Sequence, residues 1–165
     1  MDLIHELGEL ALATRLKRLS ERLSSDVSKI YKESDVDFEA KWFLILSLLE
    51  KEKVMAITAI ADSLQLSHPA IIQFVQELTQ KNLIKTVADK NDGRKRMVSL
   101  TAGGKKTLAQ IAPILTSIKA ENKKWIEGAS ANILSVLTEL EQALDQQSMY
   151  QRIKLDILQQ KPKRS

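Results

Sequence analysis

The sequence predicts a mainly α-helical fold with one small β-ribbon. Long stretches at both ends repeat apolar residues every three or four positions, which is the spacing of an amphipathic helix. In the middle, two short helical segments are joined by a tight turn, and two strand-like segments follow around a basic loop. This order, over residues 54–104, is typical of a winged helix-turn-helix, here flanked by long terminal helices.

The two central helices are expected at residues 58–65 and 68–81. Thr58 is expected to cap the first and Ser67 the second, because a hydroxyl can accept a backbone N–H of the first turn. The outer face of the second helix has almost no charge and carries Pro69, Ala70, Ile72, Gln73 and Gln76. Glutamine can bond the N6/N7 edge of adenine, and small apolar groups can meet thymine methyls. This face therefore suits the major groove of DNA.

Strands are expected at residues 83–88 and 96–100. The loop between them holds Asp92-Gly93, a strong tight-turn signal. The basic residues of the loop and of the strand position that follows it are Lys90, Arg94, Lys95 and Arg96. Charge is strongly positive over residues 81–106, whereas the first fifty residues are slightly acidic. A local basic patch is typical of nucleic-acid binding. The alternative, an ordinary solvated hairpin, fits less well beside a helix-turn-helix.

The flanking segments predict further helices at residues 3–33, 38–50, 101–127 and 131–158. Asp37, Thr101 and Ser130 stand at the N-cap positions of the last three. We expect one domain over residues 1–165. The apolar stripes of the terminal helices exceed what one small module can bury, so we expect a homodimer built from residues 3–33 and 105–158.

Composition argues against several classes of protein. The chain has no cysteine, which excludes disulfides and thiolate metal sites and fits a reducing cytoplasm. The longest apolar run, residues 42–49, is too short to cross a bilayer, and the acidic start does not resemble a signal peptide. The two histidines are far apart, and no glycine-rich phosphate loop or nucleophile motif is present. We expect no enzyme, no metal and no cofactor.

The wing carries the motif Asp89-x-x-Asp92-Gly93-Arg94, followed by Val98-x-Leu100-Thr101-x-x-Gly104. In this motif it resembles the wing of the MarR family of transcription regulators. The resemblance extends from about Leu7 to Glu127, and Asn91 stands where the family usually has arginine. The stretches LATRLKRLSERL, DVSKIYKESDVDFEAKW and LSHPAIIQFVQEL are most similar to the subgroup often fused to an acetyltransferase domain. We expect no such domain in these 165 residues.

The resemblance implies a dimeric, sequence-specific DNA-binding regulator, often a repressor and sometimes released by a small ligand. It implies that Asp92 orients Arg94 toward the minor groove, while the residues facing the major groove are Ser67, His68, Pro69, Ala70, Gln73 and Gln76. The operator would be a pseudo-palindrome in double-stranded DNA. Trp42 could line an effector pocket between the dimer helices and the reading module, or it could be a core tryptophan. The alternative function is a winged-helix protein-interaction module that does not bind DNA.

Overall fold

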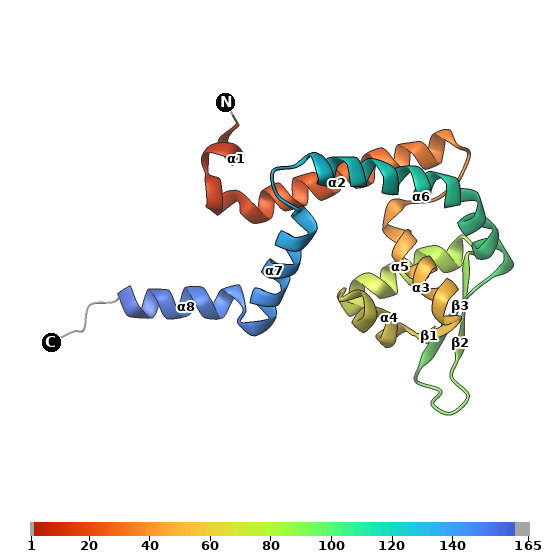
Figure 1. Ribbon diagram of the computed structural model, residues 1–165. Helices are drawn as coiled ribbons and strands as arrows, with labels where there is room; N and C mark the ends of the chain where they lie inside the picture. The colour runs from red at the N-terminus through yellow and green to blue at the C-terminus, as the bar shows by residue number, and fades with distance from the viewer. Residues whose placement is uncertain (1, 161–165) are drawn as a thin grey trace. The chain divides into compact units, whose positions relative to one another are not determined.

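The computed structural model describes residues 2–160 and divides into two compact units, Met1–Thr116 and Ser117–Ser165 (Figure 1). The first unit holds α1 (Leu3–Glu6), the 3₁₀ helix η1 (Gly8–Ala11), α2 (Leu12–Glu33), η2 (Ala40–Trp42), α3 (Phe43–Glu52), β1 (Val54–Ala56), α4 (Ile57–Leu64), α5 (His68–Gln80), β2 (Ile84–Ala88) and β3 (Arg96–Leu100). Helix α6 (Ala102–Gly128) begins in the first unit and ends in the second, which also holds α7 (Ile133–Gln146) and α8 (Met149–Gln160).

The expected fold class, mainly helical with a small β-ribbon, is confirmed. The sheet has a third strand that the sequence analysis did not predict: β1 pairs antiparallel with β3, so the strand order is β1-β3-β2. Strands β2 and β3 pair from Ile84 opposite Leu100 to Ala88 opposite Arg96. Only three residues long and directly before a helix, β1 is too short to show an alternating pattern.

The prediction of one continuous helix over residues 3–33 was wrong. Gly8 takes a left-handed backbone with φ of 53°, which glycine adopts at little cost. The chain therefore breaks into α1, η1 and α2.

Two expected helix starts in the first unit were also wrong. Glu39 has an extended backbone, so η2 and α3 begin after it rather than at residue 38. Asp37 consequently caps no helix, and its carboxylate pairs with Lys81 instead. Helix α4 begins one residue early, with Ala56 rather than Thr58 at the N-cap and no side-chain cap.

The last predicted helix, residues 131–158, is two helices. Asn132, not Ser130, caps α7, because its side-chain oxygen accepts the backbone N–H groups of Leu134 and Ser135 at 3.0 and 3.3 Å. Gln147 has an extended backbone (φ −157°, ψ 121°), which ends α7 before α8 begins.

One buried cluster holds the first unit together. Its aromatic part is a chain of edge contacts, in which the ring centroids of Tyr31 and Phe38 lie 5.1 Å apart and those of Phe38 and Trp42 lie 5.8 Å apart. The fully buried aliphatic side chains come from α3, α4, α5, the sheet and α6: Ile45, Leu46, Leu49, Ile60, Ile71, Leu78, Ile84, Val98 and Ile111. Helix α5 and the sheet are thus fixed on a common core.

The start of α6 is tied to the turn between α5 and β2. The Thr101 hydroxyl donates to the backbone oxygen of Asn82 at 2.6 Å, and its oxygen accepts the Gly104 N–H at 3.0 Å, so Thr101 caps α6 as expected. Asn82 takes a left-handed backbone (φ 55°) that turns the chain into β2. At Gly104 a Cβ would lie 2.1 Å from the Leu83 carbonyl oxygen, so only glycine fits without a shift of the backbone.

We predict that Gly104→Ala destabilises the protein by about 1–3 kcal/mol, because the added methyl overpacks against backbone that cannot rotate away. The matched control is Gly128→Ala, where a Cβ would meet no atom within 4 Å. Thermal unfolding followed by circular dichroism measures both. Equal melting temperatures for the two variants would show that Gly104 is not packed tightly against the Leu83 carbonyl.

Candidate nucleic-acid interface

Helix α5 exposes an uncharged surface over its first turns. The Ser67 hydroxyl oxygen caps the helix by accepting the Ala70 N–H at 3.4 Å. The buried stripe is Ile71, Val75 and Leu78. This stripe fixes the rotation of the helix, so that Ala70 is half-buried. The exposed residues of this face are Ser67, His68, Pro69, Ile72, Gln73 and Gln76. The structure therefore gathers the candidate major-groove residues on the outer side of one helix.

Gln73 is held by a neighbour on its own helix. Its side-chain Nε2 donates to Glu77 Oε1 at 2.9 Å. The other carboxylate oxygen of Glu77 accepts the Trp42 indole N–H at 2.7 Å and pairs with Lys41 Nζ at 2.9 Å. Gln73 is therefore connected through Glu77 to the core of the first unit.

Lys41 binds the same carboxylate from the core side. Its ammonium also pairs with Glu39 at 3.1 Å and lies 5.7 Å from the ring centroids of both Trp42 and Phe74. Burial alone lowers the pKa of Lys41, but hydrogen bonds to Glu77 and Glu39 outweigh it and raise that pKa above its ordinary value. The hydrogen bond from Lys41, supported by those from Trp42 and Gln73, lowers the pKa of Glu77 although burial opposes it. Both groups are therefore charged at neutral pH.

The wing loop between β2 and β3 is ordered by two aspartates. Asp89 Oδ1 accepts the backbone N–H groups of Asn91 and Asp92 at 2.8 and 2.9 Å, and these bonds lower the pKa of Asp89. A tight turn follows, closed by the Lys95 N–H donating to the Asp92 carbonyl oxygen at 2.9 Å. Gly93 lies in this turn without a left-handed backbone. The loop thus keeps its shape through side-chain acceptors at its base.

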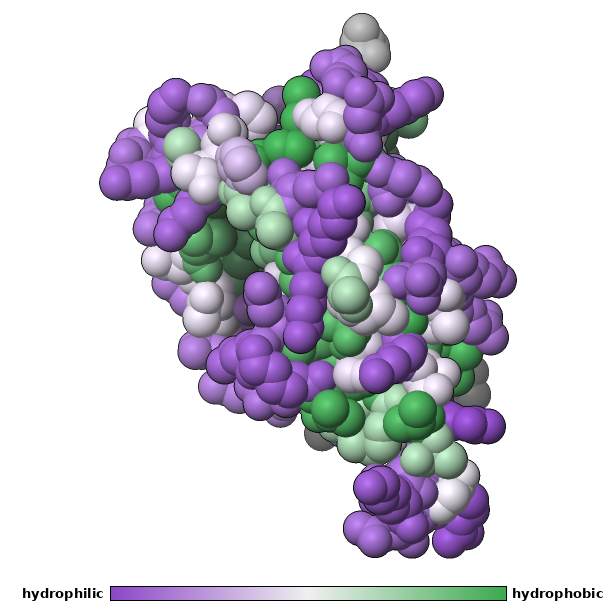
Figure 2. All heavy atoms as spheres, turned by 90° about the vertical axis from the view of Figure 1, so that its right-hand side faces the viewer, coloured by the Kyte–Doolittle hydropathy of each residue, from purple (hydrophilic) through white to green (hydrophobic). Residues whose placement is uncertain are grey.

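Arg94 lies at the end of this loop, and its side chain is 96% exposed. Asp92 Oδ1 accepts the Arg94 backbone N–H at 3.1 Å and faces Arg94 Nε at 3.4 Å. The pairing of Asp92 with Arg94 implied by the resemblance is therefore present, and their contact with DNA stays a prediction. Lys90, Lys95 and Arg96 are exposed as well. Figure 2 shows hydrophilic side chains gathered at the wing tip, at the lower end of the view, with hydrophobic ones just above.

Trp42 is a core residue in this structure, with 1% of its surface exposed. Its indole N–H is satisfied by Glu77, and Lys81 Nζ lies 5.5 Å from its ring centroid. The sequence analysis did not single out Glu77, Lys41 or Lys81. The spacing of Gln73 and Glu77, four residues apart on one helix, was a visible signal, but the contacts with Trp42 cross from one helix to another.

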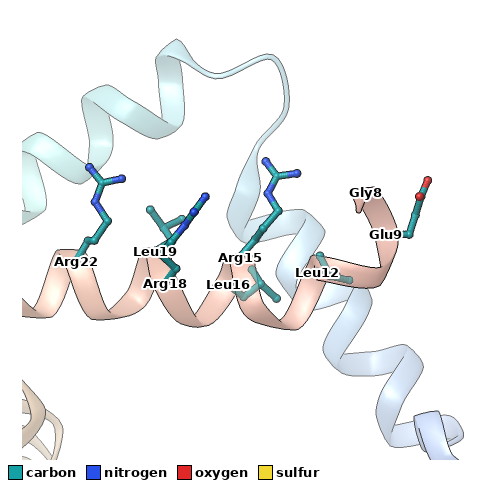
Figure 3. Close-up of a pocket in the computed structure, with 8 residues that line it drawn as sticks. All are labelled: Gly8, Glu9, Leu12, Arg15, Leu16, Arg18, Leu19 and Arg22. Atoms are coloured by element: carbon teal, nitrogen blue, oxygen red, sulfur yellow. The ribbon is translucent and has the colours of Figure 1, made fainter. Parts of the chain in front are cut away.

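A second surface lies on the first turns of α2. An open groove of about 590 Å³ is lined by Gly8, Glu9, Leu12, Arg15, Leu16, Arg18, Leu19 and Arg22. Arg15, Arg18 and Arg22 project from the same side of the helix (Figure 3). Arg18 pairs with Asp2 at 3.2 Å. The leucines of this surface remain 39–46% exposed.

Two other kinds of site are absent from residues 2–160. No helix there is both long and apolar enough to span a membrane. Within the same residues, no group of three or more potential metal ligands comes together.

The sequence and the fold are similar to known regulators. The model of the MarR family matches residues 39–95, and no curated protein matches the chain in sequence. The regulator MOSR from M. tuberculosis, in complex with DNA, has a TM-score of 0.68 at 16% identity over 81% of this chain and 95% of that one.

Two further solved structures share the fold. PcaV from Streptomyces coelicolor, with its natural ligand, has a TM-score of 0.64 at 18% identity over 86% of this chain and 94% of its own. A mutant MarR from E. coli, with operator DNA, has a TM-score of 0.57 at 19% identity over 87% and 99%. Residues 39–95 therefore match the MarR family in sequence, and the chain shares the fold of these solved structures.

Proposed function

We propose that this chain is a sequence-specific DNA-binding repressor that acts as a homodimer and is released by a small ligand. The proposal rests on two surfaces that both belong to the first unit. One is the uncharged, exposed face of α5, and the other is the wing tip, where the Arg94 side chain is 96% exposed. An α-helix fits the major groove, where base edges differ most. An arginine fits a narrow minor groove, whose negative potential attracts it.

Similar structures support this reading. MOSR and the E. coli MarR mutant were solved with DNA, which favours DNA as the partner here. PcaV was solved with its natural ligand, which favours regulation by a small molecule. We propose that such a ligand contacts Trp42. Because only 1% of its surface is exposed, a ligand can meet the indole only if neighbouring side chains move.

The proposed dimer rests on apolar surface that one chain leaves uncovered. Along α2, the exposed large apolar residues are Leu12, Leu16, Leu19, Leu23 and Ile30 (Figure 3 labels the first three). Helix α7 separately exposes Ile133, Leu134, Val136, Leu140 and Leu144. In a symmetric homodimer, a second copy of the chain would cover these apolar residues. Two copies related by a two-fold axis would bind half-sites about one helical turn, or roughly 10 base pairs, apart.

We predict a dimer in sedimentation equilibrium at micromolar concentration and a shift toward monomer for Leu16→Asp, which places a charge in the proposed interface. The control is Leu44→Asp, because Leu44 on α3 is also exposed, at 51%, but lies outside the α2 stripe. A wild-type monomer at that concentration, or equal effects of the two variants, would contradict the proposed interface.

We predict that Arg94→Ala leaves the melting temperature unchanged, because the side chain is almost fully exposed. It should weaken DNA binding most where the flanking sequence is A/T-rich. If Arg94 also contacts a phosphate, the slope of log affinity against log salt concentration should become shallower by about the amount that one phosphate contact contributes. Gel-shift titration at two salt concentrations measures both effects. The control is Lys32→Ala on α2, and an equal loss in both variants would mean that the wing adds only a diffuse positive field.

We predict that Gln73→Ala costs about 1–3 kcal/mol of binding on the preferred site, the worth of a bidentate base contact. Selection of bound fragments from a random DNA pool supplies that site and its variants. Gln110→Ala, at an exposed glutamine of α6, is the control. Relative affinities across site variants that are unchanged in Gln73→Ala would show that Gln73 reads no base. Failure of the wild type to enrich any fragment from the pool would favour the protein-interaction module instead.

A further inference from the structure

One carboxylate joins the exposed face of α5 to the core of the first unit. The side chain of Glu77 is 26% exposed, and its two oxygens have different partners. Oε2 faces the core, where it binds the Trp42 indole N–H at 2.7 Å and Lys41 Nζ at 2.9 Å. Oε1 accepts the Gln73 amide at 2.9 Å. The carboxylate thus has no freedom to turn without breaking a contact on the core side.

The partners on the core side are themselves fixed. Trp42 is 1% exposed and packs edge-on against Phe38 with centroids 5.8 Å apart. Lys41 is held by Glu39 at 3.1 Å and by two aromatic faces. A charge-assisted hydrogen bond of this kind is stronger than a neutral one. The position of Glu77 is therefore set by its contacts with Trp42 and Lys41.

An ionised carboxylate only accepts hydrogen bonds, so it selects one of the two orientations of the Gln73 amide. The NH₂ group must face Glu77, and the carbonyl oxygen must point away. An amide has two N–H donors, of which Glu77 uses one. The remaining N–H and the carbonyl are one donor and one acceptor, which is the pair that the N7/N6 edge of adenine requires. The edge of guanine offers two acceptors and does not match.

We propose that Glu77 is a positioning residue that makes Gln73 specific for adenine, and that Lys41 and Trp42 hold Glu77 in place for this role. The inference rests on the proposed function, in which Gln73 faces the major groove. It goes further by assigning the choice of base to a residue that does not itself touch DNA.

The test compares DNA discrimination in four proteins: wild type, Glu77→Gln, Gln73→Ala and the double variant. Glu77→Gln keeps the shape of the side chain and an acceptor for Trp42, but its amide can donate as well, so Gln73 can flip. The ratio of affinities for the selected site and for sites with the adenine replaced should fall about fivefold or more in Glu77→Gln, since a bidentate contact supplies such a ratio. In the Gln73→Ala background, Glu77→Gln should change the ratio by less than about twofold, because the residue through which it acts is gone.

Glu52→Gln is the matched control for the lost negative charge, because Glu52 pairs with Lys51 on α3. It should raise affinity for all sequences alike and leave the ratio unchanged. An unchanged ratio in Glu77→Gln, or an equal fall in the Gln73→Ala background, overturns the inference while leaving the proposed function intact. If Gln73→Ala itself leaves the ratio unchanged, Gln73 reads no base and the inference fails together with that part of the proposed function.

A second measurement needs no DNA. The side-chain NH₂ resonances of Gln73 in the free wild-type protein should differ from those of exposed Gln110 and should move toward them in Glu77→Gln. Resonances of Gln73 that already match those of Gln110 in the wild type would show that Glu77 does not hold the amide, and would overturn the inference even if the variant folded poorly.

Discussion

The close contact between Gly104 and the Leu83 carbonyl is the constraint on which the rest of the winged helix-turn-helix depends. Here the end of α5, the start of β2, the end of β3 and the start of α6 meet, and Thr101 bonds both sides of the crossing. The wing is therefore anchored at its base next to α5. Since α5 is also fixed by its buried stripe, the helix and the base of the wing are held together in the first unit.

Positive charge in this chain has two separate uses. Lys41 and Lys81 lie over the Trp42 ring, and each of them pairs with a carboxylate of the first unit. The exposed charges at the wing tip belong to Lys90, Arg94, Lys95 and Arg96. The basic stretch in the sequence is thus a mixture, and Lys81, at its first position, is structural. Affinity for DNA should depend on the wing, and the stability of α5 on the lysines near Trp42.

Several structural features that depend on residues close together in the sequence were predicted correctly. Ser67 as a cap, Thr101 as a cap and the β3 strand all follow from neighbours in the chain. Elements set by distant contacts could not be predicted this way. The strand β1 exists because β3 pairs with it, and Asp37 is drawn to Lys81, 44 residues away. In the candidate site, the exposed residues were predictable, but the bond from Trp42 to Glu77 was not.

We propose that α5 and the wing bind DNA together as one surface. Hydrogen exchange of backbone amides, compared with and without the selected duplex, tests this most directly. We expect slower exchange on binding in two segments, the first turns of α5 and the loop 89–95, in the same titration and with the same midpoint. Protection of only one of these segments, or protection of neither while DNA is bound, would contradict it.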